Sequence, residues 1–209
     1  MRKRPVARKV LVAGLTLAAA AMLVGAVPDM VRYLKIAMMQ KRAVARYVVM
    51  PEESRVWAEA RSSIHPIRVE TAGFEGELEA EVAEGQVCLA PPTRIELAVE
   101  LLKSNNSLVD AELRRKLEAR KHPRIEGRLR EARPLPGSRC LLRGDLTMHG
   151  VSRPLEVEAL VRAPDPDTLE VEGEKTIDMR DFNLAPPRFL IFRVEPTVRI
   201  RAKLLARRA

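Results

Sequence analysis

The feature that most constrains the fold is an alternation of apolar and polar residues through residues 139–162, interrupted by a short polar connection. Residues of one parity are apolar or small on both sides of this connection: Cys140, Leu142, Gly144 and Leu146 before it, and Leu155, Val157, Ala159 and Val161 after it. Alternation with a period of two is typical of half-buried strands. Gly150 can supply a positive φ in the connection, and Pro154 suits the first residue of a strand. The stretch therefore predicts an antiparallel hairpin.

The same alternation continues along most of residues 54–206. Further strand candidates lie at residues 56–60, 67–71, 74–82, 94–100, 125–130, 169–174 and 198–204. Residues 107–119 differ, because they are rich in helix formers; Ser107, three residues before Asp110, resembles a helix start, and Pro123 ends the segment. About eight strands, one inserted helix and frequent turn signals predict an antiparallel barrel or sandwich.

The N-terminus carries a different signal. Residues 10–27 are an uninterrupted apolar stretch of 18 residues that follows a strongly basic start. A spanning helix needs about 17–25 such residues, whereas a cleavable signal has an apolar core of about 7–15. We therefore expect residues 1–28 to be a signal anchor, with a signal peptide cleaved after Ala26 as the alternative.

The positive charge of the chain is concentrated beside this apolar stretch. Residues 1–50 hold ten Lys/Arg and one acid, while the remaining residues hold 27 of each sign. Binding to nucleic acid needs a basic face on the folded domain, so we expect no nucleic-acid partner. A basic amphipathic stripe at residues 29–48 predicts an interfacial helix on anionic lipid or a solvated stalk, assigned to residues 29–53.

The folded domain is then expected at residues 54–206. The export-like start favours an inner-membrane protein that crosses the membrane once, with the domain in the periplasm or outside the cell. Cleavage of the signal would instead leave a soluble periplasmic or secreted protein.

An eight-stranded barrel has an interior that side chains fill or that holds one small ligand. The expected inward residues are aliphatic and small, without a charge to bind a polar group, so the lumen suits an apolar, elongated guest. A filled core without a guest is the alternative. The candidate lumen residues are Trp57, Phe74, Leu97, Val99, Leu129, Leu142, Leu146, Val157, Val171, Phe182, Phe189 and Phe192.

Catalytic chemistry is hard to assemble from this sequence. The three histidines lack the spacing of metal ligands, and no nucleophile or phosphate-loop motif occurs. We therefore expect no enzyme, no metal and no catalytic residue. His149 is expected to hydrogen-bond its own turn, and Asp110 and Asp181 to make structural contacts. Cys88 and Cys140 could form a disulfide outside the cytoplasm or be two small buried residues.

Residues 146–154, Leu-Thr-Met-His-Gly-Val-Ser-Arg-Pro, resemble a conserved block of the YceI family. Three weaker resemblances follow the family's order, at residues 54–76, 110–125 and 176–184. Three features depart from the family pattern: Val109 stands where an arginine is usual, the aromatic pair ahead of the lysine–proline step is missing near residues 117–119, and Asn183 replaces a glycine, although Asn tolerates a left-handed conformation.

The resemblance implies an exported, eight-stranded lipocalin-like barrel without catalytic residues that holds a polyisoprenoid or similar amphiphile. We therefore expect a membrane-tethered lipid-binding protein outside the cytoplasm whose tether keeps the barrel mouth near the bilayer, with no cofactor except such a bound lipid. The alternative is an anchored structural or protein-interaction module with a filled barrel, which uses the acidic strand at residues 75–81. Oligomeric state stays open, a homodimer included.

Overall fold

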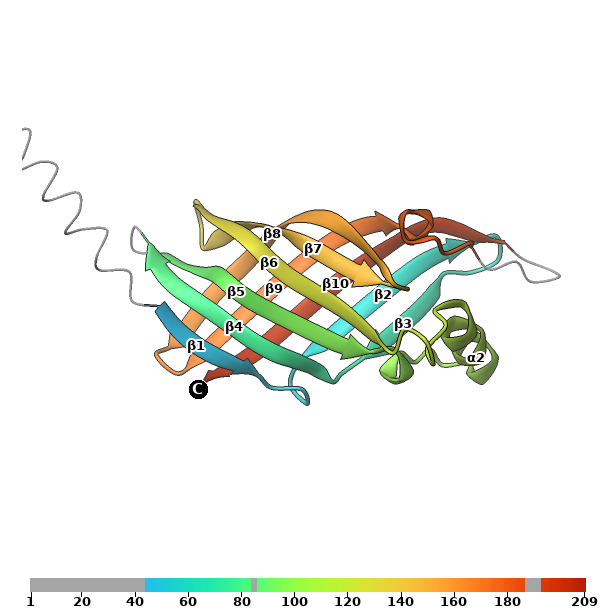
Figure 1. Ribbon diagram of the computed structural model, residues 1–209, viewed down its shortest axis with the longest axis horizontal. Coiled ribbons are helices and arrows are strands. Elements are labelled where there is room, and N and C mark those ends of the chain that lie inside the picture. The colour runs from blue at the N-terminus through green and yellow to red at the C-terminus, as the bar shows by residue number, and fades with distance from the viewer. Residues whose placement is uncertain (1–43, 84–85, 187–192) are drawn as a thin grey trace, which may run out of the picture. The chain divides into compact units, whose positions relative to one another are not determined.

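The computed structural model describes residues 44–83, 86–186 and 193–209 (Figure 1). These residues form strands β1 (Val44–Val49), β2 (Arg55–Ser62), β3 (Ile67–Thr71), β4 (Phe74–Ala83), β5 (Gln86–Ala98), β6 (Arg124–Leu135), β7 (Arg139–Met148), β8 (Val151–Asp165), β9 (Thr168–Asp178) and β10 (Val194–Arg208). The helical elements are α2 (Ser107–Lys116) and two 3-10 helices, η1 (Val99–Leu101) and η2 (Met179–Phe182).

The ten strands form one antiparallel sheet that closes on itself. Its order is β1-β4-β5-β6-β7-β8-β9-β10-β2-β3, and β1 also pairs with β10. Since β1 and β2 follow one another along β10, they act as one interrupted strand, and β3 with β4 act as another. The buried Ser54 connects β1 to β2, and its hydroxyl accepts from the Leu205 amide at 3.1 Å. The expected eight-stranded barrel with one inserted helix is confirmed.

The start of the barrel corrects one expectation. Residues 29–53 were expected to form a helix or stalk, but residues 44–49 are strand β1. Tyr47 lies opposite Leu78 of β4, and Val49 lies opposite Ala206 of β10. These side chains are buried while Val44 and Val48 are exposed, which is a period of two. A six-residue segment fits either period, which explains the error.

The barrel therefore begins ten residues earlier than expected, at Val44. The expected anchor at residues 1–28 and the remainder of the juxtamembrane segment, residues 29–43, lie outside the described residues. Among the residues that the structure does describe, none of the helices has the length and apolar character to cross a membrane.

The predicted hairpin is formed by β7 and β8, which pair from Arg139 opposite Leu160 to Met148 opposite Val151. His149 and Gly150 connect the strands with φ values of 53° and 73°. Two consecutive positive φ values give the turn whose twist matches paired strands. Gly150 is further constrained because a Cβ there would lie 2.5 Å from Cε1 of His122.

The residue that caps the N-terminus of helix α2 lies one position earlier than the sequence suggests. The Asn106 side chain, rather than Ser107, accepts from the backbone amides of Leu108 and Val109. Asp110 instead binds the preceding loop: its Oδ1 accepts from the amide of Ser104 at 2.6 Å and from its hydroxyl at 2.7 Å. These charge-assisted bonds hold the pKa of Asp110 below its ordinary value.

The interior of the barrel has two different halves. The closed half contains the β6–β7 and β8–β9 connections and the C-terminus, and its inward side chains are sealed from water. The largest of them include Leu78 and Leu169, each 0% exposed, and Val161 at 1%. The open half contains the β7–β8 hairpin, α2 and η2, and many of its inward side chains are partly exposed.

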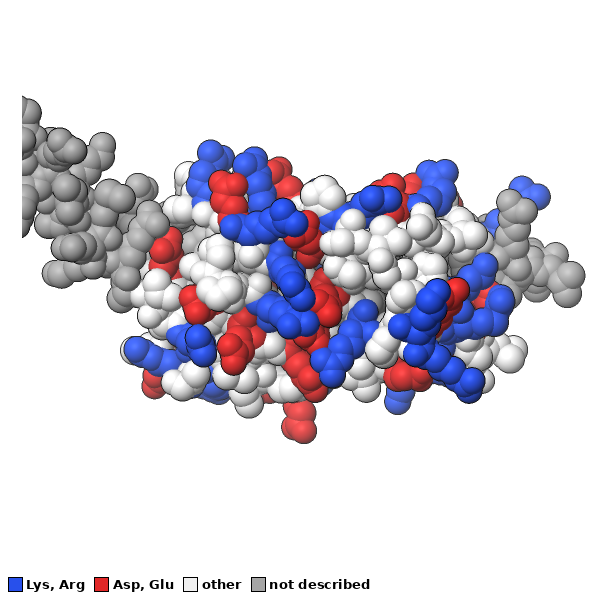
Figure 2. Space-filling view, viewed as in Figure 1, with Lys and Arg blue, Asp and Glu red and all other residues white. Residues whose placement is uncertain are grey.

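Figure 2 shows basic and acidic side chains interleaved over one face of the barrel. Cross-strand ion pairs account for this pattern, since Arg201 of β10 binds Glu172 of β9 and Arg143 of β7 binds Glu156 of β8. The acidic strand β4 also has a basic neighbour: Arg46 lies 3.7 Å from both Glu77 and Glu79. Its carboxylates are therefore partly compensated within the barrel.

A disulfide bond joins Cys88 of β5 to Cys140 of β7, with a Cα–Cα distance of 5.9 Å. Both residues are buried. Strand β6 lies between β5 and β7 in the sheet, but β5 pairs with β6 only from Arg94 to Ala98. The disulfide thus joins β5 to β7 in the closed half, where the β5–β6 pairing has stopped.

We expect the double variant Cys88→Ala/Cys140→Ala to lose about 4 kcal/mol of unfolding free energy. The disulfide closes a loop across 52 positions, and the chain-entropy relation gives about that stabilisation. For a domain of this size the melting temperature should fall by roughly 10 °C. Thermal unfolding followed by circular dichroism measures this change. The reductant-treated wild type should match the variant, and equal stability with and without reductant would contradict the disulfide's role.

Stability should also depend on the charge of Asp110. Because its pKa is lower in the folded chain, the carboxylate stabilises the fold at pH values above its unfolded pKa of about 3.9. This contribution disappears as the pH falls through the folded-state pKa. Asp110→Asn should therefore cost about 1 kcal/mol at pH 7, a value reduced for solvent screening. Urea unfolding at pH 7, 5 and 3 should show the gap between wild type and variant closing at the lowest pH, and a constant gap would refute the assignment.

Candidate functional site

The open half of the barrel presents an aliphatic inner wall that is partly accessible. Register assigns these residues to the inner face, because they are in phase with the buried side chains of the closed half. They come from β2, β5, β6, β7, β8, β9 and β10. The partly exposed members are Ala58, Ala60, Ile95, Ile125, Gly127, Leu129, Gly144, Leu146, Leu155, Val157, Gly173, Ile177, Val198, Ile200 and Ala202.

The sequence candidates for the lumen divide into several groups. Leu129, Leu146 and Val157 belong to the partly exposed wall. Leu142 and Val171 are buried members of the inner face, while Phe74, Leu97, Val99 and Phe182 are buried in the hydrophobic core. Phe189 and Phe192 lie outside the described residues.

Trp57 is a correction, because it points out of the barrel. It lies opposite Arg201 of β10 and Glu70 of β3, which are outward positions, whereas Val56 and Ala58 lie on the inner face. The Arg201 guanidinium carbon lies 5.9 Å from the centre of its ring, a cation–π contact on the outer surface. The aromatic character of Trp57 suggested a lumen residue, but parity places it outside.

Lys175 is the residue that the sequence reasoning missed. It lies opposite Ile200, and the neighbouring pairs of the same phase are Gly173 with Ala202 and Val171 with Leu204. Lys175 is therefore at an inward position of β9, and it is exposed. The expectation of an inner face without charge is wrong. Extending the alternation of Leu169, Val171 and Gly173 by two residues would have found it.

The pairing of β8 with β9 ends close to Lys175. Going toward the open half, the last paired residues are Ala159 and Gly173, although β8 continues back to Val151 and β9 continues to Asp178. Beyond this point β8 pairs with β7 and β9 pairs with β10. We call this stretch, residues 151–158 and 174–178, the β8–β9 seam. Its inward residues Leu155, Val157 and Ile177 are partly exposed.

His149 fastens the hairpin to η2 rather than to its own turn. Its Nδ1 donates to the carbonyl oxygen of Phe182 at 3.2 Å, and since that oxygen can only accept, Nδ1 carries the proton. The ring is mostly buried and packs edge-on against His122, with centroids 5.3 Å apart. His149 was expected to hydrogen-bond its own turn, and it bonds η2 instead.

Glu118 faces both imidazoles. Its carboxylate oxygens lie 3.8 Å from Nε2 of His149 and 3.9 Å from Nε2 of His122. The pKa of Glu118 lies below its ordinary value, chiefly because the Lys121 ammonium binds it and also because of the two histidines. Among the described residues, this cluster included, no group of three or more His, Cys, Asp or Glu side chains is arranged to hold a metal ion. Glu118, His122 and His149 thus form a polar cluster just after the end of α2.

Asp181 makes its contact through the backbone instead of the carboxylate. Its carbonyl oxygen accepts from Nε of Arg153 at 2.7 Å, which ties β8 to η2. Arg180, which precedes Asp181 in the sequence, instead binds Asp178 at 2.6 Å, and the Asp178 carboxylate also caps η2. Asn183 then adopts the left-handed conformation that the sequence predicted, with φ of 58°.

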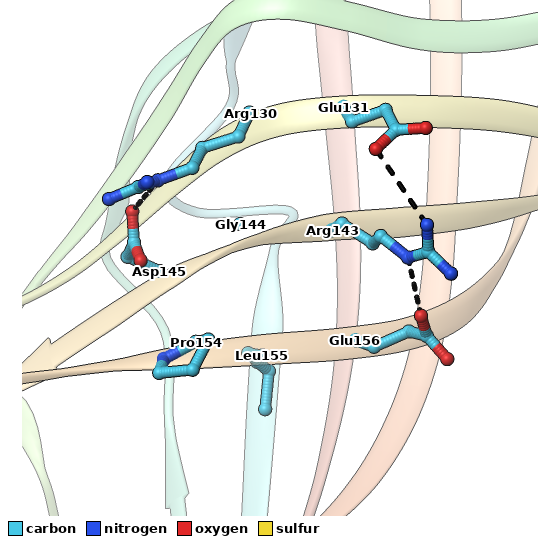
Figure 3. Close-up of a pocket in the computed structure, with 8 residues that line it drawn as sticks. All are labelled: Arg130, Glu131, Arg143, Gly144, Asp145, Pro154, Leu155 and Glu156. Atoms are coloured by element: carbon cyan, nitrogen blue, oxygen red, sulfur yellow. Dashed lines mark hydrogen bonds and ion pairs between the residues drawn. The ribbon is translucent and has the colours of Figure 1, made fainter.

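A shallow depression lies on the outer face of β6, β7 and β8 (Figure 3). Its volume is about 370 Å³. Arg143 lies between Glu156, at 2.5 Å, and Glu131, at 3.8 Å, while Arg130 binds Asp145. The charged groups in Figure 3 thus compensate one another. This arrangement suits a solvated surface better than an apolar ligand.

Comparison with known proteins agrees with this geometry. The YceI-like domain family matches residues 47–206. This chain belongs to the YceI-like domain family. The match covers the barrel from β1 to β10 and includes the β7–β8 hairpin, so the resemblance in the sequence is confirmed. No curated protein matches the sequence.

Solved structures of three proteins share the fold of this YceI-like chain. BcnA of Burkholderia cenocepacia is 18% identical, with a TM-score of 0.65 over 75% of this chain and 98% of its own. A polyisoprenoid binding domain from Saccharophagus degradans, implicated in plant cell wall breakdown, is 10% identical, with a TM-score of 0.59 over 80% and 100%. A YceI protein of Campylobacter jejuni is 14% identical, with a TM-score of 0.55 over 66% and 83%.

The hydrogen bond from His149 to Phe182 predicts a specific loss of stability when His149 is replaced. His149→Asn keeps a residue that tolerates positive φ but shortens the side chain that reaches Phe182, so the unfolding free energy should fall by about 1–2 kcal/mol. Ser152→Ala, on the exposed side of the same hairpin, is the control and should change it by less than about 0.5 kcal/mol. Urea unfolding compares them, and an equal effect of both variants would disprove the stabilising role of this hydrogen bond.

Proposed function

We propose that this protein binds a long-chain, mainly apolar lipid, a polyisoprenoid or a similar amphiphile, in the open half of its barrel. The observation that carries the proposal is the contrast between the two halves. Inward aliphatic side chains are sealed from water in the closed half and partly exposed in the open half. Partly exposed aliphatic walls gain free energy when a lipid chain covers them.

The energetics suit a guest with few polar contacts. Each methylene removed from water is worth about 0.8 kcal/mol, so a chain of several isoprene units binds through burial. Gly173 and Ala202 are small, and a Cβ at Gly173 would make only ordinary contacts, at 3.6 Å, with Ala159 and Val157. Likeness to the Saccharophagus degradans polyisoprenoid binding domain supports the same ligand class. A binding role, rather than a catalytic one, follows from these features.

The open end also exposes apolar side chains. Ile64 in the β2–β3 connection is 58% exposed, Leu101 in η1 41%, and Leu108 in α2 76%. All three belong to elements at the open half. We infer that a lipid enters and leaves the barrel at this end, where it meets apolar surface before it reaches the inner wall.

We further propose that residues 1–28 anchor the protein in the inner membrane, with the barrel in the periplasm or outside. The basic, apolar start of the chain supports this placement. The described part of the chain enters the barrel at Val44, in the closed half.

The test is the chemical content of the purified protein. The full chain, extracted from membranes in mild detergent, should carry lipid that native mass spectrometry detects as a discrete added mass. Organic extraction followed by lipid analysis should identify that mass as a long-chain species. Protein that carries no lipid, and takes up none from added polyisoprenoid, would rule out the proposal.

A side chain that fills part of the open half should weaken binding. Ala202 lies on the inner wall opposite Gly173, so Ala202→Phe places a ring where the guest would lie. Exclusion of about three methylenes lowers affinity roughly 50-fold. Thr176→Phe, an exposed outward position of β9, is the matched control and should bind normally. Lipid titration followed by native mass spectrometry compares them, and undiminished binding by Ala202→Phe would place the guest elsewhere.

A further inference from the structure

Lys175 is a cation on an otherwise aliphatic inner wall. Its cross-strand neighbour on β10 is Ile200, and the next inward residues along β9 are Gly173 and Ile177. The Lys175 side chain is exposed, so its ammonium stays hydrated beside this apolar wall and is available to an anion. Within the described residues, no hydrogen bond or ion pair holds its ammonium group.

Among the described residues, the inward positions of the open half carry positive charge and no carboxylate. Besides Lys175, the charged residue in phase with the inner wall is Arg153 of β8, which lies opposite Leu146. Arg153 is already engaged, because its Nε donates to the Asp181 carbonyl. Of these two residues, Lys175 is therefore the one that remains available to a ligand.

The carboxylate whose pKa is affected by Lys175 lies on the outer surface. The pKa of Glu156 is held below its ordinary value mainly by the hydrogen bond and charge of Arg143, with a further contribution from Lys175. Glu156 lies on the outward side of β8, and Lys175 lies on the inward side of β9. Lys175 itself belongs to the β8–β9 seam, and its side chain is exposed there.

We propose that Lys175 binds the anionic head of the lipid, a phosphate or carboxylate, while the chain lies against the inner wall of the open half. This inference rests on the proposed function and specifies its ligand class as an anionic amphiphile. A lysine ammonium is a compact charge on a flexible stem with three donors, which suits a phosphate or carboxylate oxygen at a wet seam.

The test compares lipids that share a chain and differ in the head. Geranylgeranyl monophosphate and geranylgeraniol form one pair, and palmitate and hexadecanol form another. Isothermal titration calorimetry on the full chain in detergent should show wild type binding each anionic lipid about tenfold more tightly than its alcohol, the size expected for one charge-assisted hydrogen bond. Inorganic phosphate at millimolar concentration should neither bind nor compete, since the chain supplies most of the affinity.

Two variants and one control assign the preference to this residue. Lys175→Met keeps the length of the side chain and should lose the preference for the anionic head while binding the alcohols as before. Lys175→Arg keeps the charge and should keep the preference. Lys203→Met removes a lysine from the outward side of β10 and should behave as wild type.

The outcomes separate this inference from the proposed function. Equal affinity of wild type for anionic lipids and alcohols, or an unchanged preference in Lys175→Met, overturns the role of Lys175 and leaves lipid binding intact. Binding of inorganic phosphate alone with the affinity of the anionic lipids would make the residue a free-anion site and would also overturn the proposal. Failure of every lipid to bind wild type would overturn both.

Discussion

Closure of the sheet around β10 is the constraint on which the other features depend. This strand pairs with β9 along one side, and with β2 and then β1 along the other. The break between β1 and β2 would leave an irregular edge, but Ser54 and Met50 both bond the backbone of Leu205 across it. Closure removes the free edges of an open sheet and forces each strand to turn one face inward. The separation of an aliphatic interior from a charged exterior follows from this geometry.

Pairing is incomplete between β5 and β6 and between β8 and β9, and the two interruptions are bridged differently. Between β5 and β6 the pairing stops in the closed half, where a disulfide joins β5 to β7. Between β8 and β9 it stops in the open half, where η2 is tied to the hairpin by His149 and Arg153 without a covalent link. Hydrogen bonds of this kind open more readily than a disulfide. One half is therefore a rigid, filled base, and the other retains accessible apolar surface.

Parity along each strand was sufficient to predict most of the inner face, and the two errors came from setting parity aside. Trp57 was assigned to the lumen for its aromatic ring, although Val56 and Ala58 of the opposite parity are the inward residues. Lys175 was omitted although it continues the phase of Leu169. The disulfide, the end of the β8–β9 pairing and the contact of His149 with Phe182 depend on which residues of distant strands face one another. A local pattern does not contain that register.

Charge is distributed differently on the two faces of the sheet. On the outer face, cations such as Arg143 and Arg201 meet carboxylates on neighbouring strands, and these contacts shift the pKa values of Glu156 and Glu172 downward. On the inner face of the open half, Lys175 forms no ion pair with a carboxylate of the described residues, although its charge contributes to the lowered pKa of Glu156 on the outer face. Cations on the outer surface are paired with carboxylates of neighbouring strands. An inward cation without an inward carboxylate is therefore an exception that packing does not explain. A ligand that carries the missing negative charge provides the same pairing inside the barrel, and it couples recognition of the head to burial of the chain.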